Sequence, residues 1–135
     1  MLRRLFCLWF LLATPAQAGL FGSDAPGRIP VPARVFEASV EDTAGTSVAL
    51  TRVTFNGEVY LYGLLGKGQV TVHFEDITRV SFEPGPDADH RLATVQPKEG
   101  DAVQLLVESD LPVYGKTSFG NYRIEVSDLR ILSFP

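Results

Sequence analysis

The four tyrosines are the side chains whose type and spacing best suit contact with another molecule. Tyr60 and Tyr62 are two positions apart, so an extended strand would place both rings on one face. Tyr114 and Tyr122 come from a similar segment further along the chain. Such rings stack on sugars or line a peptide groove, although aromatic residues in strands more often pack as cross-strand pairs. We therefore expect these rings to pack in the core or as cross-strand pairs, and we keep Tyr60, Tyr62, Tyr114 and Tyr122 as the candidate residues if the protein binds a ligand.

A second group of residues could bind a metal ion. Asp87, Asp89 and His90 lie close together in one polar segment, and Glu83 is nearby. Oxygen ligands in a loop can hold a hard cation, but this spacing matches no calcium-binding loop. Zinc would require more histidine or cysteine ligands than the segment offers. The sequence therefore predicts a solvated acidic loop and no cofactor, with Asp87, Asp89 and His90 as the candidates if a metal does bind.

The sequence contains few residues that could form a catalytic site. The sequence has no Gly-x-Ser-x-Gly motif, and its single cysteine is Cys7, close to the N-terminus. It has two histidines, His73 and His90, and His73 falls on the polar side of an alternating segment. A hydrolase would require one of them to be hydrogen-bonded to a carboxylate with a hydroxyl nearby. We therefore predict a protein that is not an enzyme and keep a hydrolase as an alternative.

Residues 1–18 have the three parts of a bacterial signal peptide. Arg3 and Arg4 form a short positive region, residues 5–13 are apolar, and residues 16–18 read Ala-Gln-Ala. A small-x-small tripeptide of this kind is the usual cleavage site. The pattern predicts a helical Sec-type signal peptide cleaved after Ala18 and a periplasmic or secreted protein. Residues 19–34 are rich in proline and glycine, which predicts a flexible arm.

Charge and hydropathy narrow the classes of partner. Without residues 1–18 the chain has ten basic against 16 acidic side chains, a formal charge of −6, and no cysteine. An acidic balance disfavours nucleic acid, because the phosphate backbone is bound by lysine and arginine. No later segment is apolar for the roughly 20 residues that a membrane helix requires. The mature protein is therefore predicted not to span a membrane and to hold its fold by core packing alone.

Alternating hydrophobicity predicts β-strands from residue 35 to the C-terminus. Phe36, Ala38 and Val40 alternate with polar residues, and no segment has a sustained helical period. The apolar phase slips by one residue near Thr51, which predicts a β-bulge. The dipeptide at 56–57 is Asn-Gly, the typical two-residue hairpin turn. We predict one all-β domain over residues 35–135.

Two segments of the predicted domain resemble each other. Residues 66–82 align with residues 118–134 at a constant offset of 52, and the similarity extends to the segments 59–82 and 111–134. Both end in Ser-Phe, at Ser81-Phe82 and Ser133-Phe134. A period of this length suits a supersecondary unit of several strands. The predicted fold is a small antiparallel barrel or a two-sheet sandwich built from two repeated β-meander units.

These observations favour an exported, non-enzymatic module of the cell envelope that binds a protein or a polymer such as a glycan. The alternatives are a small β-barrel that binds a ligand or glycan with its tyrosines, and a hydrolase. The size of any cavity beside the tyrosine rings would separate the first two functions.

Overall fold

The computed structural model describes residues 27–135, so the predicted signal peptide and the first part of the arm lie outside the described residues. The described chain is all-β, as predicted, and two short 3₁₀ turns, η2 (Phe74–Asp76) and η3 (Val126–Asp128), interrupt its strands. Within residues 27–135, no helix combines the length and the apolar character required to cross a bilayer. The ten strands are β1 (Glu37–Asp42), β2 (Ser47–Phe55), β3 (Tyr60–Leu65), β4 (Gly68–His73), β5 (Ile77–Pro84), β6 (His90–Pro97), β7 (Val103–Glu108), β8 (Pro112–Lys116), β9 (Asn121–Glu125) and β10 (Leu129–Ser133).

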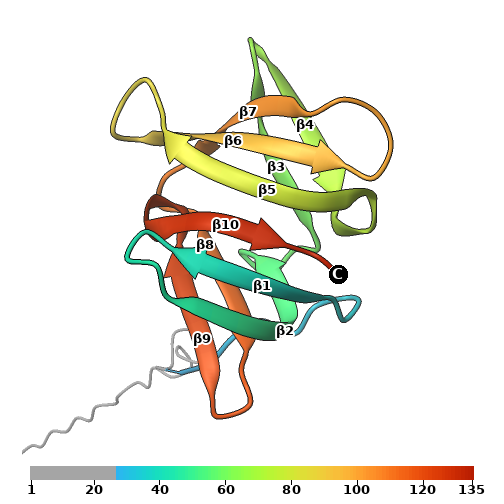
Figure 1. Ribbon diagram of the computed structural model, residues 1–135, viewed down its shortest axis with the longest axis vertical. Helices are drawn as coiled ribbons and strands as arrows, with labels where there is room; N and C mark the ends of the chain where they lie inside the picture. The colour runs from blue at the N-terminus through green and yellow to red at the C-terminus, as the bar shows by residue number, and fades with distance from the viewer. Residues whose placement is uncertain (1–26) are drawn as a thin grey trace, which may run out of the picture.

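All ten strands belong to one antiparallel sheet in the order β4-β3-β7-β6-β5-β10-β1-β2-β8-β9. The sheet curls into a half-barrel, and the hairpins β3–β4 and β8–β9 run across the direction of the other strands (Figure 1). The structure therefore has one continuous curled sheet in place of the two separate sheets of a sandwich. Strands β4 and β9 are its two edges.

Strands β5 and β10 pair with each other at the centre of the sheet and divide it into two halves of five strands. Val80 on β5 pairs with Leu132 on β10, and these two residues are themselves separated by the offset of 52. The outer hairpins have the same register, since Tyr62 pairs with Thr71 on β3–β4 and Tyr114 pairs with Arg123 on β8–β9. The sequence similarity at this offset thus coincides with matching strand pairings.

The remaining hairpins also correspond, at an offset of 55. Ala93 pairs with Leu105 on β6–β7, and Ala38 pairs with Leu50 on β1–β2. Both hairpins turn at a glycine with positive φ, Gly100 and Gly45. This correspondence escapes a sequence search at one constant offset, because β1–β2 precedes β3 in the chain while β6–β7 follows β5. One half of the sheet consists of β3 to β7, and the other is assembled from both ends of the chain.

The curled sheet encloses a single hydrophobic core. At its centre Phe74, on the turn between β4 and β5, has its ring centroid 5.7 Å from that of Phe55 and 4.9 Å from that of Phe134. Phe36, just before β1, packs edge-on against Phe74 at 5.5 Å. The buried apolar residues are Ala38, Val40, Leu50, Val53, Phe55, Leu61, Phe74, Ile77, Val80, Phe82, Ala93, Val95, Leu105, Val107, Leu111, Val113, Val126, Leu129 and Leu132.

The predicted β-bulge is confirmed, but the predicted hairpin forms only in part. The register of β2 against β8 shifts between Thr51 and Thr54, and Arg52 has a φ of 58°. Asn56 and Gly57 both adopt positive φ, and the turn closes with a bridge between Phe55 and Glu58. Beyond this bridge β2 pairs with β8 and β3 pairs with β4, so the two flanking strands diverge. Pairing with other strands buries their apolar residues in the common core.

The described part of the arm, residues 27–34, lies against the domain. The side-chain amide of Asn121 at the start of β9 donates to the carbonyl oxygen of Gly27. Arg34 pairs with Glu75 at 2.5 Å and lies over the ring of Phe36. The arm therefore contacts both halves of the sheet before β1 begins.

Candidate functional site

The two halves of the sheet differ where β3 meets β7. A single residue pair, Leu64 with Leu106, joins these strands. In the other half, β8 and β2 continue to pair at Thr54–Tyr114 and at the next position. In the β3–β7 half no residue pair beyond Leu64–Leu106 is formed, and a pocket lies beside this junction.

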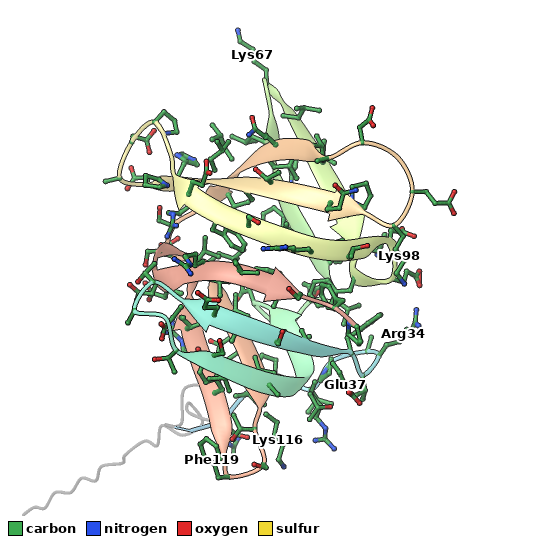
Figure 2. The ribbon with its side chains drawn as sticks, in the orientation of Figure 1. Arg34, Glu37, Lys67, Lys98, Lys116 and Phe119 are labelled. Carbon is green, nitrogen blue, oxygen red and sulfur yellow. The ribbon has the colours of Figure 1, made fainter. Side chains whose placement is uncertain are left out.

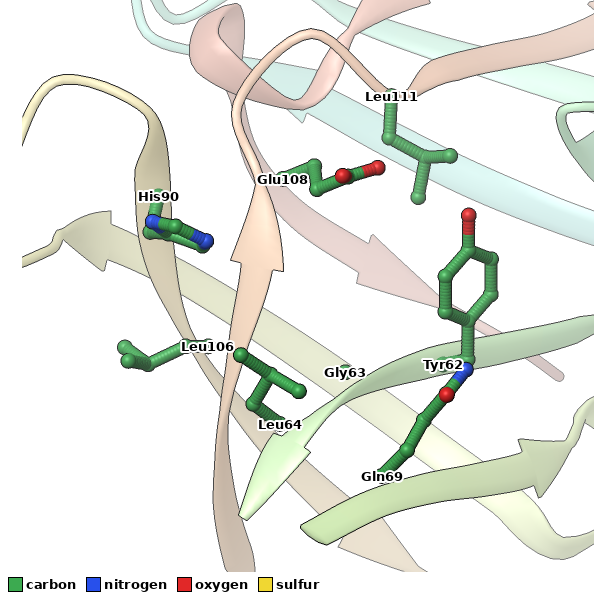
Figure 3. Close-up of a pocket in the computed structure, with 8 residues that line it drawn as sticks. All are labelled: Tyr62, Gly63, Leu64, Gln69, His90, Leu106, Glu108 and Leu111. Atoms are coloured by element: carbon green, nitrogen blue, oxygen red, sulfur yellow. The ribbon is translucent and has the colours of Figure 1, made fainter. Parts of the chain in front are cut away.

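This pocket has a volume of about 200 Å³. Its apolar side chains are Leu64, Leu106 and Leu111, with the first two close together and Leu111 apart from them beside Glu108 and Tyr62 (Figure 3). The Tyr62 ring rises from β3 with its hydroxyl pointing toward Leu111 in this view. The lining residues, here called the β3–β7 pocket, are Tyr62, Gly63, Leu64, Gln69, His90, Leu106, Glu108 and Leu111.

A hydrogen bond from a neighbouring loop orients His90 at the pocket. Its Nδ1 lies 3.0 Å from Oδ1 of Asp87, and the same oxygen accepts the backbone N–H of Asp89 at 2.9 Å. The bond with His90 is the main reason that the pKa of Asp87 lies below its ordinary value of 3.8. His90 stands directly opposite Glu108 in the β6–β7 ladder. The pocket therefore has an imidazole and a carboxylate on adjacent strands.

We expect His90→Ala to return the pKa of Asp87 toward 3.8, because the main interaction that favours the carboxylate is removed. Carboxyl ¹³C shifts of Asp87 followed between pH 2 and pH 6 measure this change. In the unmodified protein a depressed native pKa stabilises the fold above the unfolded pKa, and this contribution is lost as the pH falls through the native pKa. An Asp87 pKa that stays depressed in His90→Ala would assign the effect to the backbone N–H of Asp89.

An acidic cleft of about 580 Å³ adjoins the β3–β7 pocket and shares His90 and Glu108 with it. Three further carboxylates line the cleft, from Asp89, Asp110 and Glu125. Carboxylates on several sides disfavour an anionic group here and favour a neutral or cationic one. The full lining of the acidic cleft is Ala88, Asp89, His90, Glu108, Ser109, Asp110, Glu125 and Ser127.

The structure brings two of the four predicted tyrosines together. The ring centroids of Tyr60 and Tyr62 are 6.4 Å apart, and His73 lies 5.8 Å from Tyr60. Glu58 accepts a hydrogen bond from the Tyr60 hydroxyl and is the main cause of its raised pKa. Tyr62 lines the β3–β7 pocket, whereas Tyr60 is not among the lining residues.

The other two predicted tyrosines lie in the second half of the sheet. The guanidinium of Arg123 lies over the Tyr114 ring, 5.8 Å from its centroid, and a hydrogen bond with Tyr114 raises the pKa of Arg123. Tyr122 packs against the core, and burial raises its pKa. Within residues 27–135 no ring contact joins this pair to Tyr60 or Tyr62. The four rings do not form one continuous stripe.

The metal candidates Asp87, Asp89 and His90 are joined by hydrogen bonds. Asp87 is hydrogen-bonded to both His90 and the backbone of Asp89, as described above. Among residues 27–135, no three histidine, cysteine or acidic side chains are grouped in a way that could hold a metal ion. For the hydrolase alternative, His90 has the required carboxylate partner. Ser109 and Ser127 line the cleft beside it, and neither makes a hydrogen bond to His90 among the described contacts.

Comparison with protein families adds one finding. A family model described as "Uncharacterised protein" matches residues 32–135. The chain belongs to this family. The matched region begins in the arm and includes all ten strands, so both the β3–β7 pocket and the second half of the sheet lie within it. Neither the search of curated proteins nor the search of solved structures found a match.

Most of the pocket residues were not predicted from the sequence. Tyr62 and His90 were named as candidates, but Gln69 and Glu108 carried no signal beyond their polar positions in alternating strands. Leu64 carried a weak signal in the sequence, because it is an apolar residue close to a glycine-rich turn. In the structure this residue is 39% exposed. The pocket joins residues from β3, β4, β6 and β7, and no local pattern marks such a convergence.

Proposed function

We propose that the chain is an exported, non-enzymatic binding module of the bacterial cell envelope. We further propose that it recognises a protein partner by accepting one apolar or aromatic side chain in the β3–β7 pocket. The observation that carries this proposal is the partly apolar pocket beside the junction of β3 and β7, where these strands form one residue pair and the equivalent strands of the other half continue to pair. The N-terminal signal pattern supports export.

The size of the pocket limits what it can accept. Sites for drug-sized ligands have volumes of roughly 300–1,000 Å³. The β3–β7 pocket, at about 200 Å³, is smaller and suits a single side chain or ring. Leu64 is 39% exposed, so it provides apolar area for a partner surface at the pocket.

The polar groups of the pocket restrict the chemistry of its ligand. Glu108 and His90 stand at one side, and the acidic cleft continues beyond them. An anionic ligand would be repelled by these carboxylates, whereas a neutral ring flanked by basic groups would be favoured. We therefore expect the partner to present an apolar side chain next to lysine or arginine.

We expect a neutral peptide with one phenylalanine to bind the β3–β7 pocket, and we expect Leu64→Glu to weaken this binding about tenfold or more. The substitution places a carboxylate in the lining of the pocket, where a ring would have to desolvate it. Amide shift changes during an NMR titration report the binding, and they should be largest at Leu64, Gln69, Leu106 and Glu108. The matched control is Leu65→Glu, because Leu65 is 51% exposed and is not among the pocket residues.

The proposal is rejected if the peptide causes no shift changes in the pocket, or if both glutamate variants weaken binding equally. A second candidate function is glycan binding on the rings of Tyr60, Tyr62 and His73, which cluster on β3 and β4. Titration with an oligosaccharide that shifts Tyr60 and His73, with the peptide inert, would favour that candidate.

A further inference from the structure

The turn between β8 and β9 holds one aromatic side chain in solvent. Phe119 is 88% exposed, the most exposed aromatic side chain in residues 27–135. Thr117 fixes the turn around it, because its Oγ1 accepts the backbone N–H of Phe119 at 3.1 Å and donates to the carbonyl oxygen of Gly120 at 2.8 Å. The Thr117 side chain is itself buried. Phe119 therefore projects from a turn that is already ordered.

The fold does not require an aromatic residue at this position. The equivalent turn between β3 and β4 has Lys67 in the place of Phe119, at the offset of 52. The two residues lie at opposite ends of the molecule (Figure 2). The Phe119 ring is thus exposed on an ordered turn that does not require it, and it is available for contact with another molecule.

We propose that Phe119 of one copy of this chain inserts into the β3–β7 pocket of a second copy. The inference rests on the proposed function of that pocket and names its partner. Each molecule then carries both halves of the contact, the β8–β9 turn in one half of the sheet and the pocket in the other.

The pocket and the ring match in size and character. An apolar cavity of about 150 Å³ is known to hold a benzene ring. The β3–β7 pocket has about 200 Å³, and Leu64, Leu106 and Leu111 contribute apolar side chains to its lining. The ring of Tyr62 lies at the same pocket and offers an aromatic surface for edge-to-face contact.

The charges around the two surfaces are complementary. Lys116 ends β8 beside the turn that presents Phe119, and both lie at the same end of the molecule (Figure 2). Glu108 lines the pocket, and Asp89 and Asp110 line the adjoining acidic cleft. Insertion of the ring would bring the lysine toward these carboxylates, which selects this orientation over others.

The proposed contact is heterologous, in that the turn of one copy enters the pocket of the next and each added copy leaves one free turn and one free pocket. Such a contact gives open chains or rings, whereas two copies that exchanged both contacts would stop at a symmetric dimer. We therefore expect association beyond the dimer as the protein concentration rises.

Sedimentation velocity of the purified protein over a range of concentrations tests this proposal. The unmodified protein should show a rising sedimentation coefficient, and Phe119→Lys should raise the dissociation constant about 30-fold, as loss of an interface hot spot does. Leu64→Glu should act in the same way and Leu65→Glu should not. The double variant Lys67→Phe with Phe119→Lys has the composition and charge of the unmodified protein and should remain monomeric.

Mixing two variants separates this contact from other modes of association. Phe119→Lys keeps the pocket and Leu64→Glu keeps the turn, so an equimolar mixture should form dimers and nothing larger. A mixture that stays monomeric overturns the heterologous contact, and so does an unmodified protein that is monomeric at every concentration. Association that persists in the double variant overturns it as well, because the position of the ring would not matter.

These measurements distinguish failure of the self-association proposal from failure of the proposed function. If the unmodified protein does not associate but the Phe119→Lys variant binds the phenylalanine peptide in its pocket, the pocket function stands and the second copy is the wrong partner. If the protein does not self-associate but sediments with neutral phosphatidylcholine vesicles, and Phe119→Lys abolishes this, the turn contacts lipid and the proposal is rejected. If the protein neither binds the peptide nor self-associates, the proposed pocket function and the self-association proposal are both rejected.

Discussion

Phe74→Ala is expected to lower the free energy of unfolding by about 3–5 kcal/mol, the usual effect of removing a buried phenylalanine side chain. Phe74 is 1% exposed and lies where several distant segments meet. Its ring contacts Phe36 just before β1, Phe55 at the end of β2 and Phe134 next to the C-terminus. Removal therefore leaves a cavity between both halves of the sheet.

Urea unfolding monitored by far-UV circular dichroism measures this loss of stability. The control is Phe119→Ala, which removes the same ring from an 88% exposed position and should change stability by no more than about 0.5 kcal/mol. If Phe74→Ala were also nearly neutral, the segments would not share one core. A loss as large in Phe119→Ala would show that the β8–β9 turn depends on its ring.

Gly63→Ala should have the second largest effect, with a loss of stability of about 1–3 kcal/mol and loss of the β3–β7 pocket. A β-carbon at position 63 would lie 2.8 Å from the carbonyl oxygen of Leu106 and 3.0 Å from Cβ of Leu105. The backbone oxygen cannot rotate away, so β3 must move relative to β7. Since Gly63 lines the pocket, the same movement displaces Leu64 and Tyr62.

Chemical denaturation and the phenylalanine-peptide titration together test this expectation. Gly68→Ala is the matched control, because a β-carbon there would meet nothing closer than 3.6 Å. The equivalent glycine of the other half, Gly115, would bring a β-carbon to 2.8 Å from the Leu50 side chain, so its substitution should lower stability and leave peptide binding intact. Unchanged peptide binding in Gly63→Ala would contradict the assigned position of the pocket.

The candidate site depends on a departure from symmetry. The two halves share their registers and turn glycines, and they differ where β2 bulges at Arg52 and pairs further with β8. The corresponding strands β3 and β7 are joined by one pair and leave a pocket. The strand pairings of the two halves thus match, and a local difference between them accompanies the pocket.

The amino-acid sequence by itself determined the local structure. Alternation of apolar and polar residues specifies strands, since side chains of a strand point to opposite faces. The phase slip near Thr51 located a bulge, and the preference of Asn56 and Gly57 for positive φ located a turn. These features depend on residues within a few positions of one another, so a single sequence is sufficient to predict them.

The tertiary structure alone decided which strands pair and where a pocket forms. The Asn56-Gly57 turn would join a hairpin if local preference prevailed, yet β2 and β3 separate because each buries more apolar surface against other strands. The match between β1–β2 and β6–β7 could not be recognised in the sequence. The β1–β2 hairpin lies near the N-terminal end of the described chain, whereas β8, β9 and β10, which complete its half of the sheet, lie at the C-terminal end. Likewise, Leu64, His90 and Glu108 meet through long-range packing, whose free energy depends on the whole core and leaves no local pattern.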